Sequence, residues 1–333
     1  MEEQPYFMKA NVGDFGTYRP EDERLHPQFR SSVGTALTET HLFGFSVPEA
    51  AIHAMCYIWQ HPNLGVVSGG VLVFQGIKGH APAAEISDFR HFMSDACMRE
   101  TFPNYRLDSG YEVAMLEPGK KFRTTYADTA RRSSFDITHT AVSEPIMWPG
   151  DKHFEQVMKT RGELELRGKR YAVDGYHVRD RSWGQPRPED PVDAPPHTWI
   201  TGVFDDEHAF HLTATDDPLR NPAWREHYPN FDRSQSVKFG WLLVGGRKTR
   251  IKTASKLTTY DRVTCMPMQI DIQIVDEHDR EHRLKGTLVA GTPIHLWQNV
   301  RVPVGVARWE YEGRIGWGDV QDVQYSDYLL KNG

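Results

Sequence analysis

The 333-residue chain has few cysteines and no long hydrophobic run. Its three cysteines, Cys56, Cys97 and Cys265, lie far apart and form no CxxC pair, which argues against a zinc ribbon and a disulfide scaffold. We therefore expect a reducing, cytoplasmic location. No apolar run approaches the roughly 20 residues of a membrane-spanning helix. The acidic start "MEEQPYFMKANVGDFG" lacks the apolar segment of a secretory signal.

Positive charge and nucleotide-binding motifs are also lacking. The formal net charge is -6, so the sequence shows no basic footprint for nucleic acid, and we expect no nucleic-acid partner. No GxGxxG or GxxxxGK[ST] motif is present, which removes the usual phosphate-binding loops. The GxSxG elbow of serine hydrolases is missing as well.

Histidine is plentiful, with 16 residues, but its spacing does not indicate a metal site. His278 and His282 lie in the charged segment "DEHDREH", which we interpret as a solvated hairpin turn. His208 and His211 are three residues apart on an expected strand, so their side chains point to opposite faces. We therefore expect no metal and no other cofactor.

Most of the chain alternates apolar and polar residues between short turn signals, which predicts antiparallel hairpins. The turns are expected at "EPGKK" (117–121), "RGK" (167–169), 205–207, 245–246, 277–280 and 312–313. One helix is expected within residues 81–103, where apolar residues fall at helical spacing, and a loop at 187–196. This pattern predicts an all-β protein with two consecutive antiparallel β-barrels, comprising residues 1–145 and 146–333.

One stretch, "DGYHVRDRSWG" at residues 174–184, combines four charged groups, a tryptophan and a glycine. A surface loop would carry the charge without the tryptophan, and a core strand the tryptophan without the charge. The combination therefore indicates a partly buried polar site. In a regular strand one face would carry Tyr176, Val178 and Asp180, and the other His177, Arg179 and Arg181.

Asp180 is the candidate acid of this stretch. If its face is the barrel interior, desolvation favours the protonated carboxyl, which is then available as a general acid. The alternative is structural: Arg179 or Arg181 pairs with Asp180 at the strand end, and Trp183 packs over the pair.

The segment "VDGYHVRDRSWG" resembles the strand-end signature of the carotenoid hydratase and AttH-like superfamily. The upstream "HFEQVMKTRGELELRGKRYAVDG" and the late "VARWEYEGRIGWGDVQDV" are similar to strand pairs of that group. The resemblance spans residues 146 to about 325 and implies two consecutive lipocalin-like β-barrels. It also implies enzymes that usually need no metal or organic cofactor.

The resemblance implies roles for individual residues. Asp180 matches the acid that protonates an alkene, and His153 matches a pocket histidine from an upstream strand. Trp183 and Gly184 match the structural end of the signature. The chain departs at Val178, where hydratases of the group carry a tyrosine.

Together these observations predict a cofactor-independent lyase, hydratase, dehydratase or isomerase acting on a hydrophobic aromatic or terpenoid molecule. Loss of water or of formaldehyde from an aromatic alcohol uses the same acid–base pair. We expect Asp180 to transfer one proton and His153 or His211 the second. The expected substrate contacts are Tyr176, Arg179, Trp183, Trp199, Trp309 and Trp317. The alternative function is that of a non-catalytic carrier of an apolar ligand. A homodimer is compatible with both functions.

Overall fold

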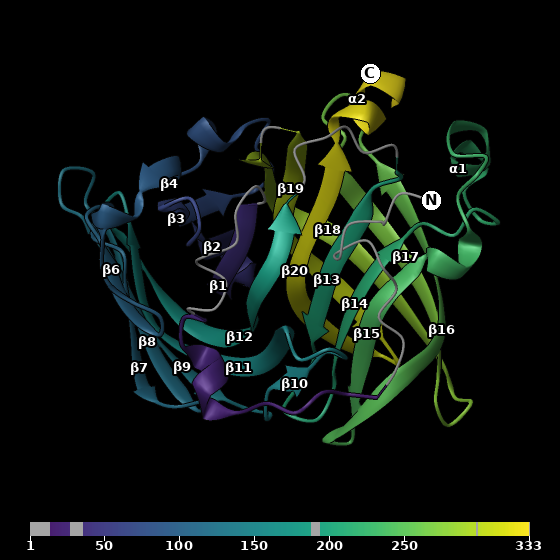
Figure 1. Ribbon diagram of the computed structural model, residues 1–333, viewed down its shortest axis with the longest axis horizontal. Helices are drawn as coiled ribbons and strands as arrows, with labels where there is room; N and C mark the ends of the chain where they lie inside the picture. Colours follow the sequence, from purple (N-terminus) through teal and green to yellow (C-terminus); the bar gives the residue numbers. More distant parts are fainter. Residues whose placement is uncertain (1–13, 27–35, 188–193, 298, 333) are drawn as a thin grey trace. The chain divides into compact units, whose positions relative to one another are not determined.

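The computed structural model describes residues 14–26, 36–187, 194–297 and 299–332. These form two compact units, and each is described by itself. The first unit contains residues 14–26, 36–75 and 82–187, and the second contains residues 76–81, 194–297 and 299–332. Both are built from antiparallel strands, which confirms the predicted all-β class (Figure 1).

The first unit is one curved sheet, drawn in purple to teal in Figure 1. Its strands pair in the order β4-β3-β2-β1-β12-β11-β9-β8-β7-β6-β5, and β10 pairs with β11. The strand bounds are β1 (Ala36–Val47), β2 (Ile52–His61), β3 (Val66–Gln75), β4 (Ile86–Ser94), β5 (Met98–Thr101), β6 (Asn104–Leu107), β7 (Glu112–Glu117), β8 (Lys121–Asp128), β9 (Ser133–Ala141), β10 (Ile146–Met147), β11 (His153–Leu166) and β12 (Lys169–Arg187).

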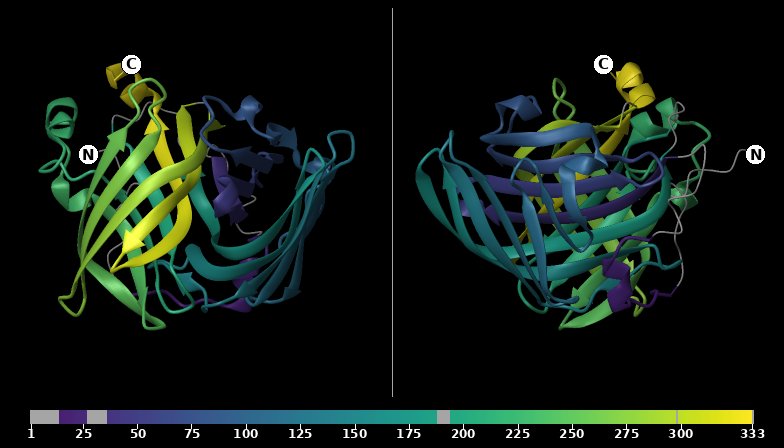
Figure 2. Two further views of the ribbon diagram at one scale, coloured as in Figure 1. Left: turned by 180° about the vertical axis from the view of Figure 1, so that it is seen from behind. Right: turned by 60° about the vertical axis from the view of Figure 1, so that its left-hand side comes forward.

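The second unit is a closed barrel in which eight strands pair in sequence order and β20 returns to β13 (Figure 2). Its strands are β13 (His197–Val203), β14 (Ala209–Thr215), β15 (Val237–Val244), β16 (Arg247–Tyr260), β17 (Pro267–Asp276), β18 (Glu281–Trp297), β19 (Val300–Tyr311) and β20 (Arg314–Tyr325).

Helices are few and short. The α-helices are α1 (Pro222–His227) and α2 (Ser326–Asn332), and the 3-10 helices are η2 (Pro20–Glu23), η4 (Pro48–Ala50), η5 (Ala81–Ala83), η6 (Asp95–Cys97) and η7 (Arg233–Gln235). Within the described residues, no helix has both the length and the apolar character needed to cross a membrane.

The boundary expected between residues 145 and 146 falls inside the first unit. Strand β11 follows this position but pairs with β9, and β12 pairs with β1. Residues 146–187 therefore complete the first sheet. Pairing between strands so distant in sequence leaves no local signal, which is why hairpin spacing alone placed the division too early. Residues 188–193 of the expected loop lie outside the described residues.

The predicted hairpin turns are confirmed, because each lies between two paired strands. The helix expected within residues 81–103 is wrong, since β4 occupies its centre and pairs with β3. Arg90 pairs with Gly69 and Met93 with Val67, so β4 contains one extra residue. Phe92 adopts a φ of 51° at this β-bulge. The bulge changes the alternation of faces, and the apolar residues then imitate helical spacing.

The inner face of the first sheet carries its hydrophobic core, which includes Phe43, Phe122 and Ile137. Directly paired residues of antiparallel strands point to the same face. His41, two residues before Phe43 on β1, pairs with Arg181, and Leu42 pairs with Asp180. The odd-numbered residues 177–183 of β12 therefore face the core, and the even-numbered residues face away from it.

Arg179 is completely buried on the inner face, with its donors satisfied. Its Nη1 and Nη2 donate to the Glu23 carboxylate of η2 at 3.0 and 2.5 Å, and its Nε donates to Gln156 Oε1 at 2.8 Å. The guanidinium carbon lies 4.2 Å from the ring centroid of Phe122 and 5.1 Å from that of Phe154. Arg179 thus attaches η2 to the inside of the sheet.

Arg181 and Trp183 hold the neighbouring part of residues 14–26, which we call the N-terminal strap. Arg181 Nη2 donates to the Glu39 carboxylate at 2.6 Å and to the Arg24 carbonyl oxygen at 2.8 Å. The Trp183 ring stacks on His26, with centroids 4.3 Å apart. Every second residue of this part of β12 therefore contacts the strap.

Gly184, the glycine of the Trp-Gly pair in the motif, interrupts the regular pairing of β12 with β1. Glu39 pairs with Trp183 and Thr38 with Gln185, so Gly184 is an extra residue on β12. Its φ is 61°, in the left-handed region that glycine adopts without steric cost. Gly184 therefore forms a β-bulge within β12.

Replacing Glu23 tests the strap attachment. We expect Glu23→Ala to reduce the free energy of unfolding by about 3–5 kcal/mol, because it leaves the Arg179 guanidinium buried without its carboxylate. Urea denaturation followed by tryptophan fluorescence measures the change. The control is Glu21→Ala, an exposed position of the same helix. Equal stability of the two variants would contradict the assigned role of the pair.

Candidate functional site

Two predicted catalytic residues of the first unit, His153 and Asp180, lie on one face of the sheet. Glu155 pairs directly with Asp180, and His153 with Ser182, so all four side chains point away from the inner core. His153 and Asp180 are 8% and 7% exposed, and Glu155 is completely buried. We call His153, Glu155 and Asp180 the acid–base row.

Glu155 holds the histidine of this row in place. Trp148 Nε1 donates to its two carboxylate oxygens at 2.8 and 2.7 Å, and His153 Nε2 lies 2.8 Å from Oε1. Because a carboxylate only accepts hydrogen bonds, Nε2 carries the proton, and Nδ1 of the neutral ring is the nitrogen able to accept another. The Glu155 and Asp180 Cβ atoms are about 5 Å apart, as in any direct antiparallel pair.

Apolar side chains surround the row on the same face. Leu42 pairs with Asp180, Val157 pairs with Val178, and all three of these hydrophobic residues are buried. Tyr176 continues the face and is half-buried, with the Lys159 ammonium 4.1 Å from its ring centroid. The arrangement places proton donors and acceptors beside buried hydrophobic side chains.

The sequence analysis considered Asp180 as an acid on the interior face of a barrel. The structure places its side chain on the opposite face of the sheet. The ring-lined interior of the first unit lies against Arg179 and Arg181, and Asp180 points away from it. The alternative of an Arg–Asp pair is also wrong for these residues. Arg179 pairs with Glu23 and Arg181 with Glu39, because neither can reach across the sheet to Asp180.

Arg179 and Trp183, expected as substrate contacts, belong to the packed interior. Arg179 is fully buried against Glu23, and Trp183 packs between His26 and Phe154, with a Trp183–Phe154 centroid distance of 6.3 Å. Both side chains serve attachment of the strap. Of the residues predicted for the first unit, the structure therefore places His153, Asp180 and Tyr176 on one face of the sheet, with Tyr176 four residues along β12 from Asp180.

The second unit contains the remaining predicted residues. His211 and Trp199 lie on the outer face of the barrel, with ring centroids 5.2 Å apart. Trp241 and Phe239 extend this ring cluster at 6.1 and 6.3 Å from His211. His211 Nε2 is 3.2 Å from Thr213 Oγ1.

The three tryptophans expected to line one cavity do not share a face. Trp309 is fully buried inside the barrel, where its ring meets Phe210 edge-on at 4.9 Å. Ile200 belongs to the same interior cluster as Trp309. Trp199 precedes Ile200 on β13, so its side chain points to the outer face. Trp317, half-buried, pairs with Arg308 on the outer face. An eight-stranded barrel separates its two faces completely, which excludes a common cavity for these rings.

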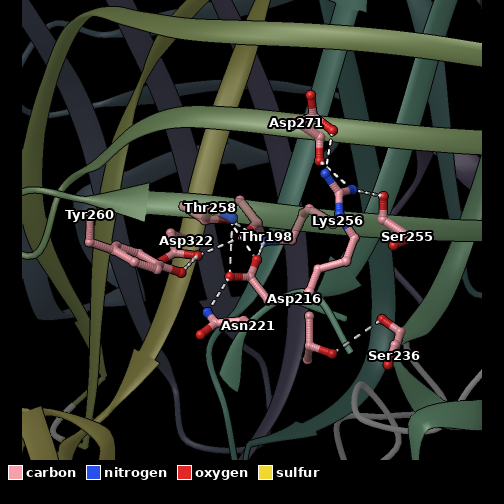
Figure 3. Close-up of polar contacts among 12 residues, drawn as sticks. Thr198, Asp216, Asn221, Ser236, Ser255, Lys256, Thr258, Tyr260, Asp271 and Asp322 are labelled. Carbon is pink, nitrogen blue, oxygen red and sulfur yellow. Dashed lines mark hydrogen bonds and ion pairs between the residues drawn. The ribbon is translucent and has the colours of Figure 1, made fainter. Parts of the chain in front are cut away.

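A polar network occupies the inside of this barrel (Figure 3). Lys256 Nζ donates to Asp216 Oδ1 and Thr258 Oγ1, both at 2.6 Å, and Asn221 donates to Asp216 at 2.9 Å. Lys256 and Asp216 are completely buried. These bonds satisfy the Asp216 carboxylate from several sides, as a stable buried pair requires.

Asp322 lies beside this pair. It accepts hydrogen bonds from Thr198 at 2.6 Å and from Gln324 at 2.8 Å, and Tyr260 OH lies 3.4 Å away. Burial raises the pKa of the Asp322 carboxyl, although the Lys256 charge opposes the shift. Burial also raises the pKa of Tyr260. The network is well bonded, and we assign it to barrel stability.

Metal-binding side chains do not gather in the described parts of the chain, where no group of three or more His, Cys, Asp or Glu is arranged to hold an ion. His282, expected in a solvated turn, is buried. Its Nδ1 is 2.8 Å from Tyr311 OH and its Nε2 is 3.1 Å from Asp276 Oδ2. These bonds help to fix the hairpin. Although burial raises the pKa of Asp276, hydrogen bonds from the Arg280 backbone and from the His282 and Arg280 side chains hold it below its usual range.

Sequence reasoning missed Glu155, which connects the acid–base row. Its signal was the alternation in "HFE", which places His153 and Glu155 on one face once β11 is recognised as a strand. Glu23 and Glu39 were also missed. Only the fold brings these two carboxylates to Arg179 and Arg181.

Comparison with solved structures supports the fold assignment. The chain resembles an AttH candidate from Nitrosomonas europaea, with a TM-score of 0.57, 14% identity, and coverage of 95% of this chain and 99% of that one. It also resembles CghA (TM-score 0.54, 12% identity, coverage 96% and 96%). Kievitone hydratase from Nectria haematococca gives a TM-score of 0.53 at 13% identity, with coverage of 96% and 98%.

The TM-scores and the coverage show a common fold, and they confirm the predicted resemblance to AttH-like proteins at the level of the fold. No match is found among curated proteins. A family model matches residues 19–326, almost the whole chain. The protein therefore belongs to the family described as a domain of unknown function, DUF7064.

Proposed function

We propose that the protein is an acid–base lyase of the hydratase or dehydratase type, acting without a cofactor on a hydrophobic aromatic or terpenoid molecule. The observation that carries the proposal is the buried acid–base row. His153 and Asp180 share one face of the sheet, and Glu155 joins them. The fold shared with a protein named kievitone hydratase supports the same class of reaction.

In the hydration direction, the Asp180 carboxyl gives its proton to one alkene carbon, and a cation forms on the other. A water oxygen attacks this carbon while His153 Nδ1 takes a proton from the water. The product has gained one hydrogen and one hydroxyl, and proton exchange with solvent returns Asp180 and His153 to their starting forms. Dehydration follows the same steps in reverse.

Glu155 acts in this scheme as a positioning residue. Its bond to His153 Nε2 fixes the ring and its tautomer, and it stabilises the imidazolium that forms during the reaction. The two Trp148 contacts hold the Glu155 carboxylate in turn. His153 is preferred to His211 for the second proton because it lies on the Asp180 face and has a carboxylate beside it.

The hydrophobic side chains beside the acid–base row favour a hydrophobic substrate. Leu42, Val157 and Val178 are buried apolar neighbours, and the half-buried Tyr176 supplies an aromatic face. A hydroxyl group on the substrate would be held by the acid–base row while its apolar part lies on these side chains.

Replacing Asp180 tests the proposed proton donor. We expect Asp180→Asn to lower turnover about 100-fold or more with little change in ligand affinity, because an amide cannot donate this proton. The assay offers aromatic and terpenoid alkenes in ¹⁸O-labelled water with a chelator and no added cofactor. Mass spectrometry detects addition of labelled water.

The matched control is Asp174→Asn, an exposed position on the same strand and the same face. It should retain full turnover. If Asp180→Asn also keeps full turnover, Asp180 is not the acid. If the wild-type protein binds these compounds without converting any of them, it is a carrier.

Replacing Glu155 tests the positioning role. We expect Glu155→Gln to lower kcat about 10²–10⁴-fold while KM stays close to the wild-type value, because the amide no longer stabilises the protonated histidine. Steady-state kinetics on the best substrate measure both constants. Glu163→Gln, at an exposed position on the same face of β11, is the control. A change confined to KM would contradict a role in proton transfer.

A further inference from the structure

Lys238, in the second unit, is a buried lysine for which the described part of the chain supplies no counter-ion. Its relative exposure is 3%. Among the described residues it has no hydrogen bond and no ion pair, and its one polar contact is with the ring of Phe231, whose centroid lies 6.0 Å from Nζ. Lysine is rarely buried unless it is paired, so this side chain is unusual for a structural residue.

The backbone sets Lys238 apart as well. Phe239 pairs with Thr213 and Val237 with Ala214, so Lys238 is the extra residue of a β-bulge on β15. Such bulges leave one residue outside the regular pairing and redirect its side chain, and they are over-represented beside active sites.

Aromatic residues gather beside this part of the barrel. Trp224, Tyr228 and Tyr328 form a buried cluster, and Phe231 packs against it. Trp224 Nε1 and Ser236 Oγ are buried, and neither has a hydrogen-bond partner among the described residues. Each can bond to a polar group on a ligand, while the rings offer a flat apolar surface.

Burial lowers the pKa of Lys238 to about 8, and no charged group within the described residues contributes to the shift. The charged side chains on neighbouring elements have other partners. Asp216 binds Lys256, Arg233 binds Asp217, Asp232 binds Ser234, and Lys331 lies over the ring of Tyr228. At pH 7 a lysine of pKa 8 has about 300-fold more free amine than one at 10.5.

We propose that Lys238 is a reactive amine that condenses with the carbonyl group of an aromatic aldehyde or ketone. The amine nitrogen adds to the carbonyl carbon, and the resulting carbinolamine loses water to form an imine. No oxidant or reductant is needed, and hydrolysis reverses the reaction. A lysine desolvated among apolar side chains is suited to this chemistry. This site is separate from the acid–base row and does not depend on the proposed lyase activity.

Lys256 provides an internal comparison. It is as deeply buried as Lys238, but its ammonium donates to Asp216 and Thr258. The Asp216 carboxylate, 2.6 Å from Nζ, and the Thr258 hydroxyl occupy this ammonium group, and no partner of this kind is present at Lys238 among the described residues. Lys248 and Lys285 are exposed and represent ordinary surface lysines. A comparison of Lys238 with Lys256 and with the two exposed lysines therefore separates the effect of burial from the effect of a counter-ion.

The experiment traps the imine on the full-length folded protein. Benzaldehyde and sodium cyanoborohydride are added at pH 7, so that any imine is reduced to a stable benzylamine, and peptide mass spectrometry locates the label. We expect Lys238 to react at least ten-fold faster than Lys248 and Lys285, and Lys256 to stay unlabelled. The rate at Lys238 should rise with pH to a plateau near pH 8–9.

Labelling of surface lysines alone, with Lys238 unmodified, would overturn the proposal. So would labelling of Lys238 only after unfolding in urea. Pentanal, used in place of benzaldehyde, tests the aromatic preference: slower labelling of Lys238 by pentanal supports it, and equal or faster labelling contradicts it.

Stability provides a second test. Lys238 keeps its proton more weakly in the folded state than in the unfolded state, so stability rises with pH from about 8 to 10.5 as the folded protein escapes the cost of a buried charge. We expect Lys238→Met to raise the thermal midpoint at pH 7, and the gain to shrink as the pH approaches 10.5. A variant less stable than wild type at pH 7 would show that the lysine is structural.

Discussion

The alternation of side chains along β12 is the constraint on which the first unit depends. Consecutive residues of this strand face opposite sides of one sheet, so its two faces have different roles. Arg179, Arg181 and Trp183 face the core and hold the N-terminal strap. Asp180 faces the other way and stands opposite Glu155. A shift of one residue in register would exchange these roles completely.

The inner arginines explain why so much charge occurs in a buried strand. A buried guanidinium is costly unless a carboxylate and further acceptors surround it. Glu23 and Gln156 meet this need for Arg179, and Glu39 with three backbone carbonyls meets it for Arg181. Such pairs add little net stability compared with an apolar core, but they specify one position for the strap. The acid on the outer face is left independent of these cations.

Much of the fold was predictable because hairpins are local. The turns at 117–121 and 245–246 follow from glycine and polar residues between alternating strands, and the structure has both. The pairing of β1 with β12 and the bulge at Phe92 were not predictable. The β1–β12 pairing joins segments far apart in sequence. The bulge inserts a residue into β4, which changes the alternation of apolar and polar residues.

The candidate site was predictable in part for the same reason. The residue types of the motif identified Asp180, an acid near a tryptophan, whereas His153 was indicated only by the resemblance to AttH-like proteins. The motif did not identify the correct face, since alternation separates two faces without saying which one meets the core. Glu155 became visible only when β11 and β12 were seen as neighbours. Lys238 belongs to no motif, and only its burial, with no counter-ion among the residues that the structure describes, distinguishes it.

The central claim is that substrate chemistry occurs on the Asp180 face of β12. The most direct measurement is a crystal structure of the protein with a hydrophobic phenolic ligand obtained by co-purification. The account predicts ligand density on the face of Leu42, Val157 and Val178, with a polar atom within hydrogen-bond distance of Asp180 or His153. Density inside the sheet, against Arg179 with Glu23 displaced, would contradict it.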